Sequence, residues 1–183
     1  HGCIPLKASG EFQPFVLHQA QYAGRELLDF FEYHIRLASK NKEIGDDFST
    51  DLIWYCWRGK SSPLFGKDKM TTFERYFIED TNTHKEQENE YFTYRNSKKI
   101  CQFILEEFGL TSKESRIVNG HTPVKTMEGE QPIRANGKLM VIDGDFCKDY
   151  HEKTGIAGYT LIYNSHHLAL AQHKPYELAK QDF

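Results

Sequence analysis

The clearest pattern of hydrophobic and polar positions lies between residues 21 and 40. Apolar side chains recur there at intervals of three and four residues, and charged side chains fill the remaining positions. This spacing is typical of a helix that buries one face. The turn-forming sequence Gly45-Asp46-Asp47 follows, so we expect the helix to end before it.

A second helix is predicted between residues 96 and 108. Ser97 is a suitable N-cap, because its hydroxyl can accept a hydrogen bond from the first turn, and Gly109 is a suitable helix end. The predicted apolar stripe of this helix consists of Ile100, Phe103, Ile104 and Phe108.

Short apolar runs in the second half predict strands at residues 116–119, 137–142, 159–163 and 167–172. The last two runs are joined by Asn164-Ser165, which indicates a compact hairpin. Helices come early in the chain and strands come late, with some mixing between them. The pattern therefore favours an α/β or an α+β fold.

Other segments are less decisive. Residues 15–17 form either a short strand or the lead-in to a helix, and residues 51–55 suit either a strand or a helix. Residues 58–70 combine glycine, serine, proline and basic residues, which is typical of an ordered loop. Residues 80–90 are the most polar stretch, and we interpret them as a solvated excursion rather than a domain boundary.

Length and composition place the chain among ordinary folded domains. It has 183 residues, of which 39% are apolar, 14% aromatic and 27% charged. This size predicts a single domain, or at most a small pair, with enough apolar material for a core. The net charge of −3 provides no basic field for nucleic acid or an anionic membrane. No apolar run approaches the roughly 18 residues that a membrane helix needs.

The four cysteines are widely spaced and form no C-x-x-C pair, which argues against a zinc ribbon or a thioredoxin-like redox site. They are Cys3, Cys56, Cys101 and Cys147. A chain of this size does not need disulfides, so we interpret them as reduced thiols in a cytoplasmic protein.

The loop that starts at Arg58 is the strongest candidate for anion binding. It offers basic side chains, hydroxyl groups and glycines that expose backbone N–H groups, all of which suit phosphate oxygens. It is not a P-loop, because Asp68 follows Gly66-Lys67 where that motif has serine or threonine. A plain basic surface loop remains the alternative. The residues that we single out in it are Arg58, Lys60, Ser61, Lys67 and Lys69.

Two of the nine histidines stand next to glycine. His1 precedes Gly2, and His121 follows Gly120 at the end of a predicted strand. A histidine on such a turn can direct its imidazole toward a metal ion. An unremarkable buried or surface histidine is the alternative for each of them.

Several longer segments together resemble one enzyme family. They are Ser61-Ser62-Pro63-Leu64-Phe65-Gly66-Lys67, residues 70–77, residues 117–125 with Asn119-Gly120-His121-Thr122-Pro123, Asp143-Gly144-Asp145-Phe146, and residues 154–161. The chain resembles class III fructose-1,6-bisphosphatase over nearly its whole length. These are the Firmicutes-type enzymes of the calcineurin-like metallophosphoesterase superfamily.

This resemblance implies an α/β fold, the C-terminal part of an αββα sandwich with a mixed sheet and flanking helices, over residues 1–183. It also implies a pair of divalent metal ions, Mn²⁺ by analogy, with His1 and His121 among the ligands. The G-D-x-x-D-R-G and G-N-H motifs of the family's first half are absent from this sequence. We therefore expect a C-terminal fragment that carries no catalytic residue of its own and is inactive alone.

The resemblance further implies hydrolysis of the 1-phosphate of fructose 1,6-bisphosphate, with a metal-activated water as nucleophile. The second phosphate needs neutralising away from the metals. From charge alone we expect Lys60, Ser61, Lys67 and Lys69 to do this, with Arg58 and Lys125 as weaker candidates. We also expect a homo-oligomer. The alternatives are a non-catalytic domain that binds a sugar phosphate or an effector, and a phosphoprotein phosphatase of the same superfamily.

Overall fold

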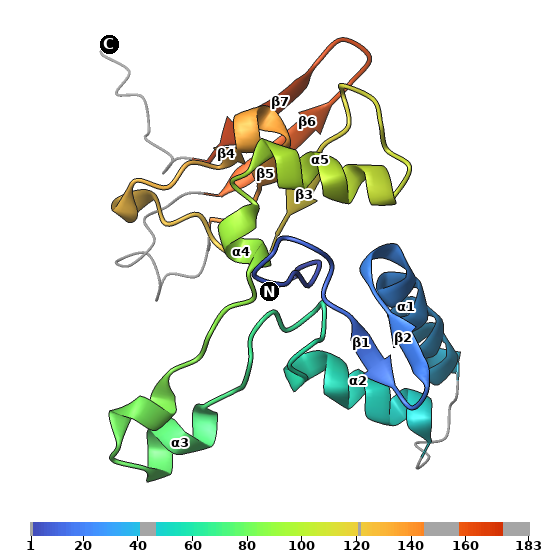
Figure 1. The fold of residues 1–183 in the computed structure, drawn as a ribbon. Coiled ribbons are helices and arrows are strands. Elements are labelled where there is room, and N and C mark those ends of the chain that lie inside the picture. The colour runs from blue at the N-terminus through green and yellow to red at the C-terminus, as the bar shows by residue number, and fades with distance from the viewer. Residues whose placement is uncertain (1, 41–46, 121, 145–157, 174–183) are drawn as a thin grey trace. The chain divides into compact units, whose positions relative to one another are not determined.

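The computed structural model describes residues 2–40, 47–120, 122–144 and 158–173 (Figure 1). The chain divides into two compact units, His1–Ser115 and Arg116–Phe183, which are described separately. The first unit contains all the α-helices that the structure describes, and the second contains the larger sheet.

The first unit is built around two packed helices, α1 (Gly24–Lys40) and α2 (Phe48–Arg58). The helix predicted between residues 21 and 40 is therefore confirmed. Asp47 caps α2, since its side chain accepts hydrogen bonds from the backbone N–H groups of Ser49 and Thr50. Residues 51–55, which suited either a strand or a helix, lie inside α2.

Aromatic side chains fill the core between these helices and a small hairpin. Strand β1 (Phe15–Leu17) pairs antiparallel with β2 (Ala20–Tyr22), so the strand alternative holds for residues 15–17. The ring of Phe15 lies 5.5 Å from the rings of both Phe31 and Tyr55, centroid to centroid. The buried members of this core are Phe15, Leu27, Phe31, Leu52 and Cys56.

The middle of the first unit is irregular and carries three short helical segments. They are α3 (Thr72–Phe77), the 3₁₀ helix η1 (Thr81–His84) and α4 (Tyr91–Tyr94). The ordered loop predicted at residues 58–70 is confirmed, because after the end of α2 the chain reaches α3 through turns held by single backbone hydrogen bonds. The polar stretch 80–90 is largely exposed, but its end turns back so that Glu88 forms an isolated β-bridge with Lys67.

The helix predicted at residues 96–108 is confirmed as α5 (Lys98–Glu107). The Ser97 hydroxyl accepts a hydrogen bond from the N–H of Ile100, and Gly109 follows with a φ of 71°. The predicted stripe is only partly right. Ile104 is buried, but Phe103 is 39% exposed and stacks on Phe12. The other buried residues of the helix are Cys101 and Leu105, so its buried face is turned toward these two residues and away from Phe103.

The second unit contains a three-stranded mixed sheet in the order β3-β5-β4. Strand β3 (Ile117–Asn119) runs parallel to β5 (Leu139–Val141), and β4 (Ile133–Arg134) runs antiparallel to it. All three residues of β5 are buried, as expected for a central strand. Two 3₁₀ helices, η2 (Thr126–Glu128) and η3 (Ala135–Gly137), lie between β3 and β5 in the sequence.

A separate hairpin completes the described part of the second unit. Strands β6 (Tyr159–Tyr163) and β7 (Leu168–Gln172) pair antiparallel over five residues each. The Asn164 carboxamide oxygen accepts hydrogen bonds from the N–H groups of His166 and His167 and so closes the turn. The predicted hairpin is confirmed.

The fold class is α/β, with helices and a mixed sheet, and the strands predicted from the second half of the sequence are present. The assignment of all 183 residues to one part of a sandwich domain stays a prediction. Within the described ranges, the helices are too short or too polar to cross a lipid bilayer.

Candidate functional site

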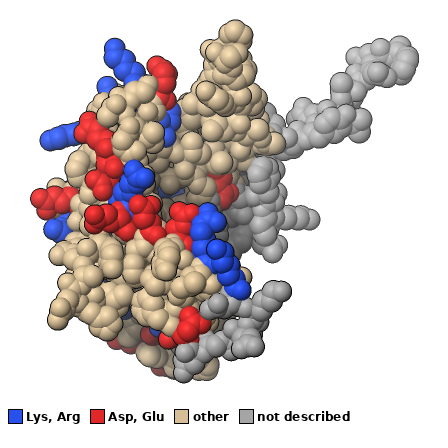
Figure 2. All heavy atoms as spheres, turned by 90° about the vertical axis from the view of Figure 1, so that its right-hand side faces the viewer, with Lys and Arg blue, Asp and Glu red and all other residues tan. Residues whose placement is uncertain are grey.

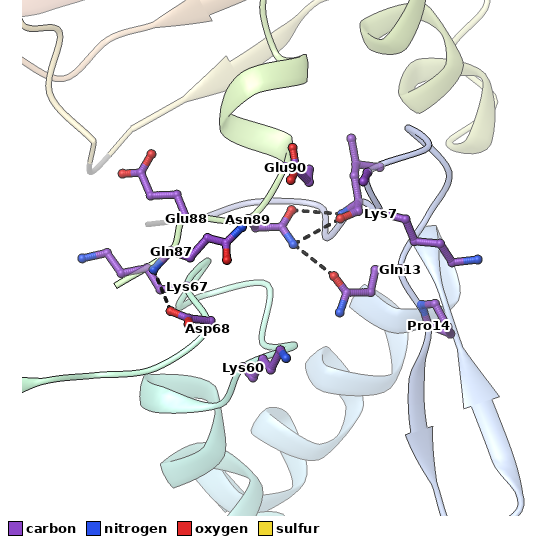
Figure 3. Close-up of a pocket in the computed structure, with 12 residues that line it drawn as sticks. Lys7, Gln13, Pro14, Lys60, Lys67, Asp68, Gln87, Glu88, Asn89 and Glu90 are labelled. Carbon is purple, nitrogen blue, oxygen red and sulfur yellow. Dashed lines mark hydrogen bonds between the residues drawn. The ribbon is translucent and has the colours of Figure 1, made fainter. Parts of the chain in front are cut away.

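A polar cavity of about 510 Å³ opens in the first unit where three separate segments meet (Figure 3). The segments come from the start of the chain, from the loop after α2 and from the end of the polar stretch. The cavity is lined by Leu6, Lys7, Ala8, Gln13, Pro14, Lys60, Lys67, Asp68, Gln87, Glu88, Asn89 and Glu90.

Asn89 fastens the first of these segments to the third. Its Oδ1 accepts hydrogen bonds from the N–H groups of Leu6 and Tyr91, each at 3.0 Å. Its Nδ2 donates to the Leu6 carbonyl oxygen at 3.4 Å and to Gln13 Oε1 at 3.2 Å. The Asn89 backbone N–H also donates to the Gly66 carbonyl oxygen at 2.8 Å. One side chain and its backbone thus hold the cavity wall together.

The position of Lys60 is set by the end of α2. Gly59 follows the last residue of the helix, and its N–H donates to the carbonyl oxygen of Tyr55. The Tyr55 ring lies so close to Gly59 that a Cβ added there would sit 2.3 Å from it. The Tyr55 hydroxyl accepts a hydrogen bond from the N–H of Ser61 at 3.2 Å. This tyrosine therefore fixes the backbone on both sides of Lys60, whose side chain is exposed.

Lys67 forms a half-buried ion pair beside the cavity. Its Nζ lies 2.8 Å from Glu86 Oε2, and the two side chains are 24% and 17% exposed. The N–H and hydroxyl of Thr71 both donate to Glu86 Oε1. Burial alone would raise the pKa of Glu86, but the hydrogen bonds from Lys67 and Thr71 and the charge of Lys67 outweigh it and lower the pKa to about 2.

The charges around the cavity are balanced rather than uniformly positive. The lining contains three lysines, Lys7, Lys60 and Lys67, and three acidic residues, Asp68, Glu88 and Glu90. Figure 3 shows that the side chains of Lys7 and Lys67 extend in opposite directions, so they do not converge on one anion. Such a lining can hydrogen-bond the hydroxyls of a polar ligand and can place one ammonium group, that of Lys60, near a phosphate.

The other predicted phosphate-binding residues lie elsewhere. Arg58 lines a separate, largely apolar groove of about 680 Å³ that also includes Val16 and Trp54. Lys69 donates from its Nζ to the carbonyl oxygen of Thr83 at 3.3 Å. Lys125 belongs to the second unit, where its Nζ lies 3.4 Å from Glu128 Oε2. The cavity thus gathers Lys60 and Lys67 but not the remaining candidates, whose roles stay predictions.

The two predicted metal ligands, His1 and His121, lie outside the described residues. No cluster of three or more histidine, cysteine, aspartate or glutamate side chains that could hold a metal ion occurs in the part of the chain that the structure describes. Catalytic metal sites usually take at least three protein ligands. The described residues therefore do not make up a metal centre, and the two histidines could supply only part of one.

The described cysteines lie in apolar surroundings rather than at a reactive site. Cys3, Cys56 and Cys101 are free in the structure and all are buried, and their reduced state in the cell stays a prediction. Burial raises the pKa of Cys3 to about 12 and those of Cys56 and Cys101 to about 11. Cys147 lies outside the described residues.

Charged side chains of both signs are visible on one side of the described surface (Figure 2). On the side of the molecule shown in Figure 2, acidic and basic side chains are interspersed, and neither sign dominates the view. Non-specific binding of a phosphate backbone requires a concentrated positive surface. This face does not provide one.

Sequence reasoning missed most of the cavity wall. Lys7, Gln13 and Asn89 come from segments that showed no periodic pattern, and residues 87–90 were interpreted as solvent-facing. One signal was available. The carboxylates at Glu86 and Glu88 follow a basic loop of opposite charge, and pairing between the two segments brings Lys67 and Glu86 together.

Comparison with known proteins gives a consistent result along the chain. The family model described as "Firmicute fructose-1,6-bisphosphatase" matches residues 1–182. A relative from Streptococcus gordonii named "Fructose-1,6-bisphosphatase class 3" is 72% identical over 99% of this chain. Relatives of the same name from Streptococcus sanguinis and Staphylococcus epidermidis are 70% and 55% identical over 99% and 96% of it.

The chain spans 28% of the length of the two streptococcal relatives and 27% of the staphylococcal one. No solved structure matches the chain. The match to the family model over residues 1–182 is nonetheless decisive, and the chain belongs to the Firmicute fructose-1,6-bisphosphatase family.

Proposed function

We propose that this chain forms one part of a metal-dependent fructose-1,6-bisphosphatase, which hydrolyses the 1-phosphate of fructose 1,6-bisphosphate to fructose 6-phosphate and phosphate. The family match over residues 1–182 carries this proposal. Relatives at 72% and 70% identity bear the name of that activity. At such identity the same substrate class is the natural expectation for the whole protein.

The cavity of the first unit is the proposed place for the non-reacting part of the substrate. Its amides and carboxylates suit sugar hydroxyls, and the exposed ammonium of Lys60 suits the phosphate that is not cleaved. Ser61 lies beside Lys60, with its N–H held by Tyr55. Lys67 supports this role indirectly, because its bond to Glu86 fixes the loop that bears both lysines.

The proposal includes a pair of metal ions, to which His1 and His121 would each supply one imidazole nitrogen as a ligand. Divalent ions, with Mn²⁺ as the proposed identity, would activate water and neutralise phosphoryl oxygens. The remaining donors would come from parts of the protein outside the described residues. We therefore expect the 183-residue chain alone to release no phosphate.

The test uses the full-length protein, with phosphate release from fructose 1,6-bisphosphate measured in Mn²⁺. We expect turnover, and a loss of at least about 100-fold in His121→Ala if this imidazole binds the metal. His166→Ala is the matched control, since His166 is an exposed turn residue of the same unit. Unchanged activity in His121→Ala would remove the metal assignment.

Substrate choice separates the proposal from its alternatives. Hydrolysis of a phosphopeptide in preference to the sugar bisphosphate would favour a phosphoprotein phosphatase. Tight calorimetric binding of the bisphosphate without metal and without turnover would favour a binding domain. The proposal places the enzyme in the cytoplasm as a homo-oligomer, and size-exclusion chromatography with light scattering tests the assembly.

A further inference from the structure

The most exposed apolar surface in the first unit lies on α3. The side chains of Phe73, Tyr76 and Phe77 are 72%, 79% and 78% exposed, and Ile78 beside them is 45% exposed. Helix α3 contributes no residue to a buried core. We call residues 70–86, which contain α3 and η1, the aromatic arm. In Figure 1 the arm lies apart from α1 and α2 of the same unit.

The base of the arm is firmly held. Thr71 is fully buried, and both its N–H and its hydroxyl donate to Glu86, which pairs with Lys67. Across the arm, Arg75 donates to the carbonyl oxygen of His84, and a ring nitrogen of His84 lies 2.8 Å from the carbonyl oxygen of Ile78. These contacts join the two ends of the arm, so the exposed rings are presented by an ordered element.

The rings form one continuous patch rather than scattered side chains. Phe73 and Phe77 stack with their centroids 6.4 Å apart, and Tyr76 lies 6.4 Å from Phe77. Single exposed apolar residues are common, but a contiguous aromatic patch on an ordered support is typical of an interaction surface. The exposed carboxylates of Glu79 and Asp80 follow the patch directly. The surface that covers it should therefore be apolar with basic side chains at its edge.

The length of the polypeptide indicates what this covering surface is. The chain spans 28% of the relatives from Streptococcus gordonii and Streptococcus sanguinis, and it belongs to their family. In proteins of that length, the larger part of the polypeptide lies outside the matched region and is covalently attached to the segment that corresponds to the arm. A covalent connection gives that part a high effective concentration, which favours it over any separate partner.

We propose that the aromatic arm docks through Phe73, Tyr76 and Phe77 on the part of the same polypeptide that lies outside these 183 residues. The inference rests on family membership and not on the proposed activity, so an inactive protein could still satisfy it. The arm would then join this portion of the protein to the remainder.

The test places a photo-crosslinking amino acid in the full-length protein. Tyr76 is replaced by p-benzoylphenylalanine, the protein is irradiated, and the products are analysed by gel electrophoresis and peptide mass spectrometry. Tyr33, an exposed residue of α1 at 63%, receives the same replacement as a matched control. We expect a product of monomer size in which the Tyr76 peptide is joined to a peptide from outside this chain.

Three results would overturn the proposal. A covalent dimer would show that a second copy covers the arm, and a link to another peptide of these 183 residues would show that the chain covers it itself. The absence of any crosslink at the Tyr76 position after irradiation would show that the arm is a free surface. As a second measurement, Phe73→Ser with Phe77→Ser should lower the melting temperature of the full-length protein, whereas Tyr33→Ser should not.

Discussion

The side-chain amide of Asn89 bonds both backbone groups of Leu6, a residue 83 positions earlier in the chain. Asn89 Oδ1 accepts from the Leu6 N–H at 3.0 Å, and Asn89 Nδ2 donates to the Leu6 carbonyl oxygen at 3.4 Å. Leu6 itself is 1% exposed, so water cannot replace these bonds. The pair fixes the start of the chain against the end of the polar stretch, and this contact forms one wall of the cavity.

Replacing Asn89 by alanine should therefore destabilise the protein by about 2–3 kcal/mol, because buried backbone groups of Leu6 and Tyr91 lose their partners. The measurement is urea-induced unfolding of the full-length protein. Asn82→Ala is the control, since Asn82 lies exposed in η1 and its bonds are to exposed neighbours. We expect that control to stay within about 0.5 kcal/mol of the parent. Equal stability of the two variants would contradict the role given to Asn89.

The two lysines of the cavity should differ in what their loss does. Lys60→Met should raise the KM for fructose 1,6-bisphosphate about tenfold, because the proposal gives this ammonium group a phosphate to bind. The melting temperature should change little, because the Lys60 side chain is exposed. Lys67→Met should lower the melting temperature, because it removes the closer of the two cations at the half-buried Glu86 carboxylate and leaves only Arg75, at 4.0 Å, among the described ion pairs. Steady-state kinetics and thermal unfolding of both variants give the comparison.

Lys99→Met serves as the control for both measurements, as Lys99 is exposed on α5 and does not line the cavity. An unchanged KM in Lys60→Met would remove the cavity from the proposed substrate site. A loss of stability in Lys60→Met equal to that in Lys67→Met would show that Lys60 is structural as well.

The elements with strong local signals could be predicted from the sequence. The spacing of three and four residues predicts α1. Ser97 and Gly109 mark the two ends of α5, and Asn164 marks the turn between β6 and β7. Their signals lie within a few residues of one another, so no tertiary information was needed. The helical state of residues 51–55 was left open, because a short apolar run fits a strand or a helix equally until Asp47 caps it.

The cavity could not be predicted in the same way, since its wall depends on contacts between distant segments. Asn89 is one polar residue in a polar stretch, and nothing near it in the sequence indicates that it bonds Leu6. The charge of the basic loop predicted Lys60 and Lys67 as phosphate-binding residues; both line the cavity, and their binding role stays a prediction. The same charge reasoning did not show that Lys67 is engaged by Glu86, because that depends on how the polar stretch turns back.

Gly59→Ala should disturb the loop that carries Lys60. An added Cβ would meet the Tyr55 ring at 2.3 Å, and this ring is packed against Phe15 and Phe31 and cannot move freely. We expect a loss of about 1–3 kcal/mol in the free energy of unfolding together with a raised KM. Gly2→Ala is the control for unfolding, because nothing lies within 4 Å of a Cβ at that position. A Gly59→Ala protein as stable as the parent would show that Tyr55 does not hold this turn.

The buried cysteines should resist alkylation in the native protein. Burial raises the pKa of Cys56 and of Cys101 to about 11 and that of Cys3 to about 12 from an ordinary 9.0. Because the thiolate is the reactive form, labelling by iodoacetamide at pH 8 should be at least about 100-fold slower than in the urea-unfolded protein. Peptide mass spectrometry resolves each cysteine separately. Rapid native labelling of Cys101 would show that α5 opens readily.

Lowering the pH should weaken the contacts that hold the two ends of the aromatic arm together, because Glu86 becomes protonated. Its pKa in the folded protein is about 2, below the ordinary value of 4.5, because the bonds from Lys67 and Thr71 outweigh the opposing effect of burial. A depressed pKa means that the ionised carboxylate contributes its full stability above pH 4.5, and that this contribution is lost as the pH falls toward 2. Between pH 7 and pH 3 the loss should be about 1–2 kcal/mol.

Glu86→Gln isolates this effect, because the amide still accepts from Thr71 but carries no charge for Lys67. The parent should be more stable than the variant at pH 7, and the difference should shrink as the pH is lowered to 3. Glu79→Gln, at an exposed position in the same arm, should show no such trend. A stability difference between parent and Glu86→Gln that stays constant from pH 7 to pH 3 would mean that the Glu86 carboxylate keeps an ordinary pKa. In that case the hydrogen bonds to Thr71, rather than the ion pair with Lys67, hold the arm in place.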